Sequence, residues 1–173
     1  TITVNGSGFD PAAATGTRLP LAGKPAGSYV VFGAFAKNWQ PSKGAASSAR
    51  PVNAGQKWAV MAADMGTIGG ASAGAIELTP QGTFTTQFTV SKALVEAKLG
   101  ENSIKDLNIG IYTYAGSGVD VAAYETFTPL SFTGEFKNPT PKPSQPSSSK
   151  AAAGSLTWGI SSGWVNYVSS YVT

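Results

Sequence analysis

Three features of the sequence predict an all-β fold. Gly and Pro supply 21 and 11 of the 173 residues, so turns are frequent, while charged residues make up only 12%. Several short stretches alternate apolar and polar residues, the period that lays one face of a β-strand on a core. Within the first 136 residues, only 91–99 (SKALVEAKL) has helical spacing, with Ser91 as expected N-cap and Gly100 as expected C-cap.

The stretch from Leu107 to Phe132 is expected to form the closing hairpin of this domain. Ile109 and Ile111 alternate with polar or small residues, and a second apolar run covers residues 126–132. Pro129 lies inside that second run and cannot donate a hydrogen bond to a neighbouring strand. We therefore expect the second strand at an edge of its sheet, or interrupted by a bulge.

Five further strands are expected before this hairpin. They cover residues 2–4, 28–36, 57–63, 76–79 and 83–90. The segment 28–36 is apolar on both faces, which predicts a central strand, and Gly33 in its middle predicts a bulge. The last two segments flank Pro80-Gln81-Gly82 and are predicted to pair as a hairpin. About seven short strands separated by turns is the pattern of an immunoglobulin-like antiparallel β-sandwich.

The alternation in these strands predicts which side chains enter the core. Phe88 and Ile109 are expected to point inward, whereas Thr85 and Gln87 are expected to face solvent. Tyr112 and Tyr114 lie on the face opposite Ile109 and Ile111. They are interpreted either as packing within the sandwich or as an aromatic binding face.

A long loop is predicted between residues 38 and 55, and loops of that length are often functional or mobile. Its only large aromatic residue is Trp39. From the sequence this side chain is equally consistent with an exposed contact residue and with burial under the loop.

Composition excludes several classes of function. There is no His and no Cys, which removes Ser-His and Cys-His catalysis and thiolate metal sites. Asp120 and Glu125 can be imagined as an acid/base pair, and Asp10, Asp64 and Asp120 as calcium ligands. Nothing in their spacing supports either reading. We expect these side chains to stabilise turns by bonding the local backbone, and we predict no metal site and no enzymatic function.

Charge and hydropathy bear on partners. Residues 1–136 carry nine Lys or Arg and nine Asp or Glu, and the excess positive charge lies at Lys137, Lys142 and Lys150. No basic face is therefore predicted, and no nucleic acid is expected as a partner.

No apolar run reaches the roughly 18 residues of a membrane span. Since Thr1 opens directly into a strand pattern, we expect a processed protein or a fragment.

The sequence predicts three segments. Residues 1–136 form the sandwich, residues 137–153 a Pro/Ser-rich linker with extended geometry, and residues 154–173 a short helical extension. In the extension, apolar residues recur at helical spacing: Ile160, Trp164, Val168 and Tyr171. Such a face needs a partner, so self-association through this helix is one expectation.

Two stretches resemble a known family. The tail LTWGISSGWVNYV is similar to the opening of the haem-transport-associated (HtaA-type) domain of actinobacterial cell-surface proteins. The matching residues, in order, are Leu156, Trp158, Gly159, Trp164, Tyr167 and Val168. The first 136 residues resemble the immunoglobulin-like module found beside such domains, through TITVNGSGFDP, SYVVFGAFAKNWQPS, GIYTYAGSG and ETFTPLSF.

The resemblance implies a secreted or surface-anchored haem-acquisition protein, in which the sandwich is a non-catalytic spacer. In that family a Tyr of the opening helix supplies the axial haem ligand, and Tyr167 is the corresponding residue. Only the start of the haem domain is present, and the supporting His is not in these residues. We therefore expect no cofactor in this chain alone, with haem or haem-carrying proteins as partners of the intact parent.

Two other functions remain open. The first is a surface adhesion module that binds polysaccharide or protein through its loops, which exposed loop aromatics would favour. The second is a small-ligand carrier resembling the chromophore-binding apoproteins of actinomycetes, which a deep cavity between the sheets would favour.

Overall fold

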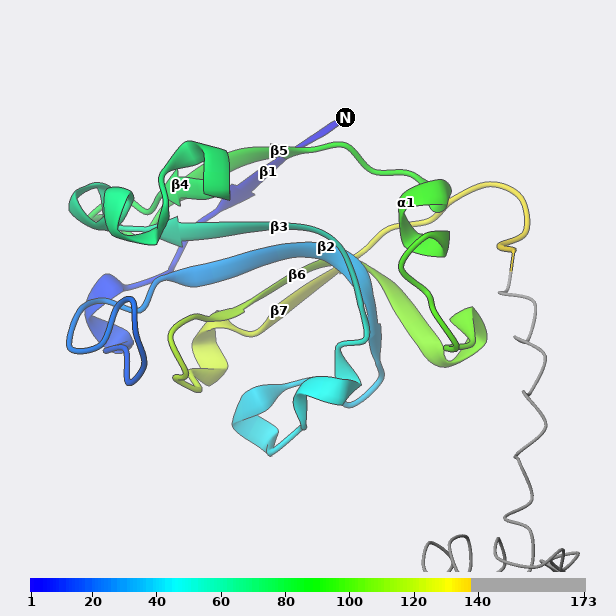
Figure 1. The fold of residues 1–173 in the computed structure, drawn as a ribbon, viewed down its shortest axis with the longest axis horizontal. Coiled ribbons are helices and arrows are strands. Elements are labelled where there is room, and N and C mark those ends of the chain that lie inside the picture. The colour runs from blue at the N-terminus through cyan, green and yellow to red at the C-terminus, as the bar shows by residue number, and fades with distance from the viewer. Residues whose placement is uncertain (138–173) are drawn as a thin grey trace, which may run out of the picture. The chain divides into compact units, whose positions relative to one another are not determined.

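Seven strands form two sheets in the computed structural model, which describes residues 1–137 (Figure 1). The strands are β1 (Ile2–Gly6), β2 (Ser28–Ala36), β3 (Val52–Val60), β4 (Ala75–Glu77), β5 (Phe84–Phe88), β6 (Leu107–Ala115) and β7 (Thr126–Pro129). The helix α1 covers Lys92–Glu96, and one-turn 3-10 helices lie in the loops. The all-β prediction is therefore confirmed.

Strand order places β2 at the centre of the larger sheet, as its two apolar faces predict. This sheet has the order β4-β3-β2-β6-β7, and the smaller sheet pairs β1 with β5. All neighbours are antiparallel except β3 and β4, which run parallel. The closing hairpin is β6 and β7, and Pro129 lies on the edge strand, where its missing N–H costs no ladder bond.

The main core lies where the two sheets face each other. Phe84 and Phe88 of β5 belong to the same packed cluster as Val30, Phe32 and Ile111 of the larger sheet. Phe88 is 5% exposed, and Ile109 is partly buried against the same cluster. Thr85 and Gln87 are exposed. The predicted register of these strands is therefore confirmed.

The bulge predicted at Gly33 is present. The pairing of β2 with β3 shifts between Phe32 and Gly33, and a Cβ at Gly33 would overlap the carbonyl oxygen of Val52. The loop prediction was too long, because β3 begins at Val52 rather than after Gly55. Small residues at the bulge interrupt the apolar alternation there, so the sequence pattern does not reveal the first part of the strand.

The predicted hairpin of residues 76–79 and 83–90 was wrong. The turn exists, since the Thr79 N–H donates to the Thr83 carbonyl at 2.9 Å. However, β4 pairs in parallel with β3, and β5 pairs with β1 in the other sheet. The turn therefore carries the chain from one sheet to the other. Turn residues report local backbone geometry and not which strand becomes the partner.

Helix α1 and the chain after β7 pack together. The Ser91 hydroxyl accepts the Leu94 N–H at 3.2 Å, which confirms the predicted N-cap. The Lys92 ammonium lies 5.0 Å from the centre of the Phe136 ring, and the Lys137 N–H donates to Glu96 Oε1 at 2.7 Å. Ordered contacts thus reach Lys137; the rest of the predicted linker and the extension 154–173 lie outside the described residues.

Candidate functional site

A row of aromatic rings crosses the face of the larger sheet that points away from the core. Tyr29 in β2 is paired in register with Trp58 of β3 on one side and Tyr114 of β6 on the other. The ring centres lie 4.8 Å and 5.4 Å apart. All three side chains are half-buried, so parts of the rings remain accessible. The period-two alternation of β2 and β6 is what turns these residues to one face.

Next to this row lies a second aromatic cluster, which is buried except at Phe127. Tyr112 stacks on Phe35 with ring centres 4.0 Å apart and on Phe127 at 4.7 Å. Trp39 covers them edge-on, 5.0 Å from Tyr112, and is only 5% exposed. The structure therefore decides the open question about Trp39, which is buried under its own loop.

The segment 37–51, here called the covering loop, is fastened over this cluster. It contains two short 3-10 helices, η2 (Pro41–Lys43) and η3 (Ser47–Ala49), and folds beneath the sheet after β2 (Figure 1). An Arg50 guanidinium nitrogen donates to the Trp39 carbonyl at 2.7 Å. The Ser42 N–H and hydroxyl donate to the two carboxylate oxygens of Glu125. The loop is thus held both to itself and to the turn before β7.

A groove of about 390 Å³, here called the tyrosine groove, opens beside the covering loop. Tyr29 and Tyr114 are among the residues that line it. Pro41 and Arg50 contribute from the covering loop. The opposite wall comes from two segments far apart in sequence, residues 18–19 and 117–120. The sequence had suggested Tyr114 as part of an aromatic face, but it gave no sign that Arg18 and Arg50 line the same groove.

Burial raises the pKa of both tyrosines in the groove. Burial raises the pKa of Tyr114, and the positive charge and hydrogen bond of Arg50 oppose that shift. The Arg50 guanidinium carbon lies 5.3 Å from the centre of the Tyr114 ring. Burial also raises the pKa of Tyr29, opposed by a hydrogen bond from the Ser117 backbone. Both phenols are therefore neutral at pH 7.

The two arginines of the groove are not neutralised by neighbours. Among residues 1–137 the only salt bridge within 4 Å joins Lys24 to Asp64, at 2.6 Å. Asp120 is the one carboxylate that lines the groove. Arg18 and Arg50 therefore leave a positive charge available to a ligand.

Ser117 has an unusual backbone conformation at the edge of the groove. Its φ is +48°, the only positive value at a non-glycine position among the described residues. The Thr17 and Arg18 N–H groups both donate to its carbonyl at 3.0 Å, and its hydroxyl donates to the Arg18 carbonyl at 3.0 Å. Such strained positions are frequent in binding sites. The sequence showed this segment only as a break between two strands.

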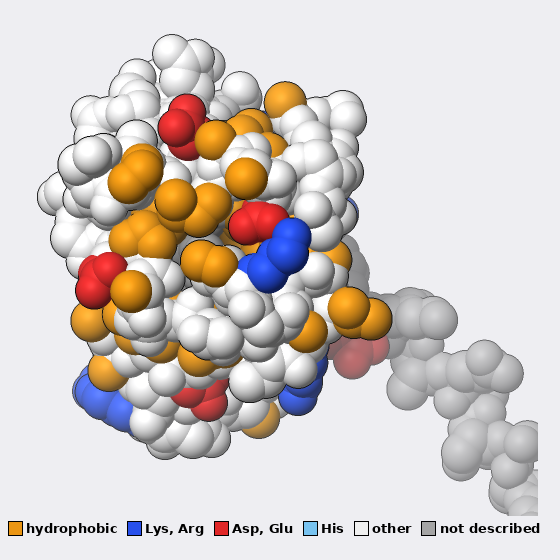
Figure 2. All heavy atoms as spheres, turned by 90° about the vertical axis from the view of Figure 1, so that its left-hand side faces the viewer, with side chains coloured by type: hydrophobic (Ala, Val, Ile, Leu, Met, Phe, Trp, Pro, Cys, Tyr) orange, Lys and Arg blue, Asp and Glu red, His pale blue; other side chains and the backbone are white. Residues whose placement is uncertain are grey.

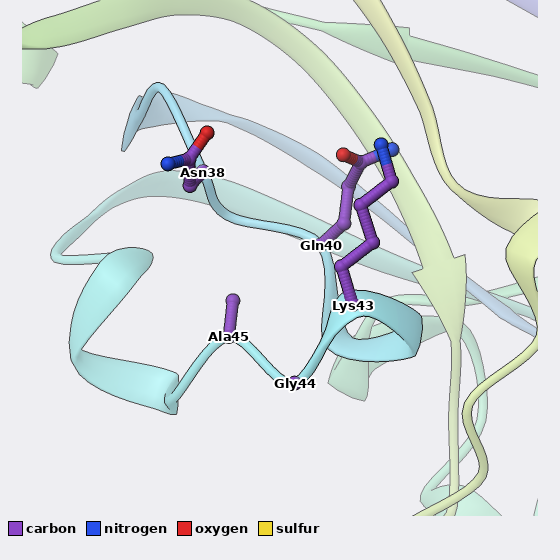
Figure 3. Close-up of a pocket in the computed structure, with 5 residues that line it drawn as sticks. All are labelled: Asn38, Gln40, Lys43, Gly44 and Ala45. Carbon is purple, nitrogen blue, oxygen red and sulfur yellow. The ribbon is translucent and has the colours of Figure 1, made fainter.

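Two further hollows lie elsewhere among the described residues. Figure 3 shows one within the covering loop, where Gln40 and Lys43 extend in the same direction above Gly44 and Ala45; its volume is about 320 Å³. The other, about 280 Å³, is lined by residues of β1, β5, β6 and β7, including Val4, Phe84 and Thr128. Apart from this open hollow, core side chains fill the space between the two sheets, so the carrier hypothesis gains no support.

Three of the four acidic residues singled out in the sequence hold loops together, whereas the fourth, Asp120, is exposed and lines the tyrosine groove. Asp10 accepts the Ala12 N–H at 3.0 Å, Asp64 pairs with Lys24, and Glu125 holds Ser42. Within the described part of the chain, no three His, Cys, Asp or Glu side chains are grouped to hold a metal ion. Tyr167, the candidate haem ligand, lies outside the described residues.

Charged side chains are sparse at the loop end of the unit. Figure 2 views this end, where Lys, Arg, Asp and Glu side chains stand apart from one another, except for one pair of opposite charge, among apolar and uncharged polar groups.

None of the helices in residues 1–137 has the length and apolar character that crossing a membrane requires.

No family model matches the chain, and neither a curated protein nor a solved structure is found to be similar to it.

Proposed function

We propose that this chain is part of a secreted or cell-surface haem-acquisition protein of the haem-transport-associated type, with residues 1–136 as its non-catalytic immunoglobulin-like spacer. The proposal draws on the sequence resemblance of both segments. The seven strands in two sheets around one core support it. The division into two and five strands, with a parallel β3–β4 pair, departs from the four-plus-three arrangement of constant immunoglobulin domains, so we infer a variant of that fold.

One observation carries the non-catalytic part of the proposal. Two carboxylates that the sequence offers for chemistry are used to hold loops together. Asp64 is bound by Lys24, and both oxygens of Glu125 are occupied by Ser42. An acid/base pair of Asp120 and Glu125 would need both carboxylates available for proton transfer, and Glu125 is engaged by Ser42.

In this proposal haem binds to the domain that begins at residue 154, with Tyr167 as axial ligand, and the partners are haem or haem-carrying proteins. A haem titration tests it, comparing this chain with a chain extended through that domain. The Soret band should appear only with the extended chain and should be lost in Tyr167→Phe. A Tyr167-dependent Soret band from this chain alone would contradict the need for the rest of the domain.

Self-association through the extension is proposed because its sequence places Ile160, Trp164, Val168 and Tyr171 at helical spacing, an apolar pattern that needs a partner. Sedimentation velocity over a hundredfold concentration range tests it. The chain should form a dimer that is abolished by Trp164→Ser; a monomer at all concentrations would contradict it.

The tyrosine groove favours a second candidate function, a surface adhesion module. Its lining comes from loops and two half-buried tyrosines. It also includes Arg18 and Arg50, neither of which forms a salt bridge among the described residues. Aromatic rings with fixed polar tips are characteristic of recognition sites. Binding of the chain to a panel of immobilised polysaccharides and surface proteins tests this function. Saturable binding that is lost in Tyr114→Ala supports it, and no binding to any member of the panel would count against it.

A further inference from the structure

We propose that the tyrosine groove binds an acidic polysaccharide by recognising a uronate residue. In this proposal the sugar ring packs on Tyr29 and Tyr114, and its carboxylate is bound by the guanidinium groups of Arg18 and Arg50. The inference rests on the second proposed function, the adhesion module, and specifies its ligand.

The tyrosines favour a sugar over a peptide. Every residue of β2 from Ser28 to Ala36 is paired with a residue of β6, so the strands that carry Tyr29 and Tyr114 are interior. A peptide that adds to a sheet needs an exposed strand edge, which these strands lack. Recognition here falls to side chains and to the loop backbone at Gly118, and two tyrosine rings offer flat apolar surface. The C–H face of a pyranose ring packs well on such a surface.

The charge of the groove favours an acidic sugar over a neutral one. Arg18 and Arg50 line the groove, and among the described residues neither has a carboxylate within 4 Å. A guanidinium group presents paired N–H donors that match the two oxygens of a carboxylate. Asp120 supplies an acceptor in the same groove, which suits sugar hydroxyl groups as donors. A uronate carries both kinds of group on one ring.

The binding groups are held in position before any ligand arrives. Arg50 is fixed by the Trp39 carbonyl and by the Tyr114 ring. The stem of Arg18 lies against Gly118, where an added Cβ would come within 2.8 Å of the Arg18 Cδ. Ser117 bonds the Arg18 backbone through both its carbonyl and its hydroxyl. Rigid groups lose less conformational entropy on binding, which strengthens a site that is open to solvent.

The test is isothermal titration of the full chain with three probes. Tetragalacturonate is the acidic sugar, its fully methyl-esterified form is the uncharged sugar of the same shape, and tetraglutamate is a peptide of the same charge. We expect measurable affinity for tetragalacturonate, at least tenfold weaker affinity for the ester, and no affinity for the peptide.

Matched variants locate the site. Arg18→Gln and Lys105→Gln each remove one positive charge from an exposed side chain, but only Arg18 lines the groove. Arg18→Gln and Tyr114→Ala should each weaken binding at least fivefold, and Lys105→Gln should have no effect. Circular dichroism should show that all three variants fold.

The other outcomes each overturn the inference in a distinct way. Equal affinity for the ester would mean that the groove binds neutral sugar, so the adhesion function would stand without its uronate. Equal affinity for tetraglutamate would identify a protein partner. Equal losses in Arg18→Gln and Lys105→Gln would show unspecific charge attraction. No binding of any probe would refute uronate recognition, and the polysaccharide and protein panel would then decide separately on the adhesion function.

Discussion

The carboxylate of Glu125 accepts two hydrogen bonds from Ser42, one from the backbone N–H at 2.7 Å and one from the hydroxyl at 2.6 Å. This pair joins the covering loop to the turn before β7, although the two residues are far apart in sequence. The contact holds the loop over Trp39 and Tyr112. It therefore shapes one wall of the tyrosine groove.

Glu125→Ala should loosen the covering loop without unfolding the sheets. Two charge-assisted hydrogen bonds at a partly exposed position add on the order of 1 kcal/mol to the free energy of opening the covering loop. Their loss should therefore raise the fraction of molecules with an open loop about fivefold. Lys43 lies exposed in this loop and is a trypsin site. Cleavage after Lys43 should be faster by that factor. Glu101→Ala, at an exposed position on another loop, is the control, and equal rates in the two variants would refute the role of Glu125.

Gly33 should not tolerate a side chain. A Cβ there would overlap the Val52 carbonyl in the paired strand, so Gly33→Ala must open the bulge between β2 and β3. We expect a loss of at least about 2 kcal/mol in the free energy of unfolding, measured by urea denaturation. Gly66→Ala is the matched control, because nothing lies within 4 Å of its Cβ position. A similar stability for both variants would show that the bulge is not as described.

Phe88 and Gln87 are neighbours on β5 with opposite environments. Phe88→Ala should lower the free energy of unfolding by about 3–5 kcal/mol, because it empties a site in the core between the sheets. Ile109→Ala should cost less, since that side chain is only partly buried. Gln87→Ala should change stability by less than about 0.5 kcal/mol. Equal effects at Phe88 and Gln87 would reverse the assigned register.

Stability should fall at alkaline pH because of buried tyrosines. Burial raises the pKa of Tyr112 to about 12, and it also raises the pKa values of Tyr29, Tyr114 and Tyr124. In the unfolded chain tyrosine ionises near pH 10, so the unfolded state loses its protons first. The stabilisation that these buried tyrosines give the folded state is complete below pH 10 and is lost as the pH rises from 10 to about 12.

Urea denaturation at pH 9, 10 and 11 measures this loss. Tyr112→Phe should be less stable at neutral pH, because the hydrogen bond to the Asn108 carbonyl is gone, but should show a shallower decline above pH 10. An unchanged stability of the native chain between pH 9 and 11 would contradict the assigned burial.

The sequence predicted those parts of the fold that depend on local pattern. The two apolar faces of residues 28–36 indicated a central strand, and Gly33 indicated the bulge. Pro129 indicated an edge strand. The pairing of residues 76–79 could not be predicted, because the turn at Pro80-Gln81-Gly82 gives the same local signal whether the next strand stays in the sheet or crosses to the other one.

The candidate site was only half visible in the sequence. The alternation in residues 107–115 placed Tyr112 and Tyr114 opposite the core face, and packing then decided that Tyr112 is buried while Tyr114 is half-exposed. Arg18 and Arg50 belong to loops, and nothing in their local sequence shows that they line the same groove. The positive φ of Ser117 is likewise set by contacts with residues 17 and 18.

Replacing residues 1–136 within the proposed surface-anchored parent protein tests the central claim most directly. The replacement is an unrelated β-sandwich of similar size, and equal display on the cell surface is verified with an antibody tag. We predict that haem uptake is retained, since the proposed haem ligand, Tyr167, follows this module in the sequence, while binding of the cells to polygalacturonate is lost. Loss of haem uptake at equal display would show that the module takes part in haem transfer and would contradict its role as a non-catalytic spacer and binding module.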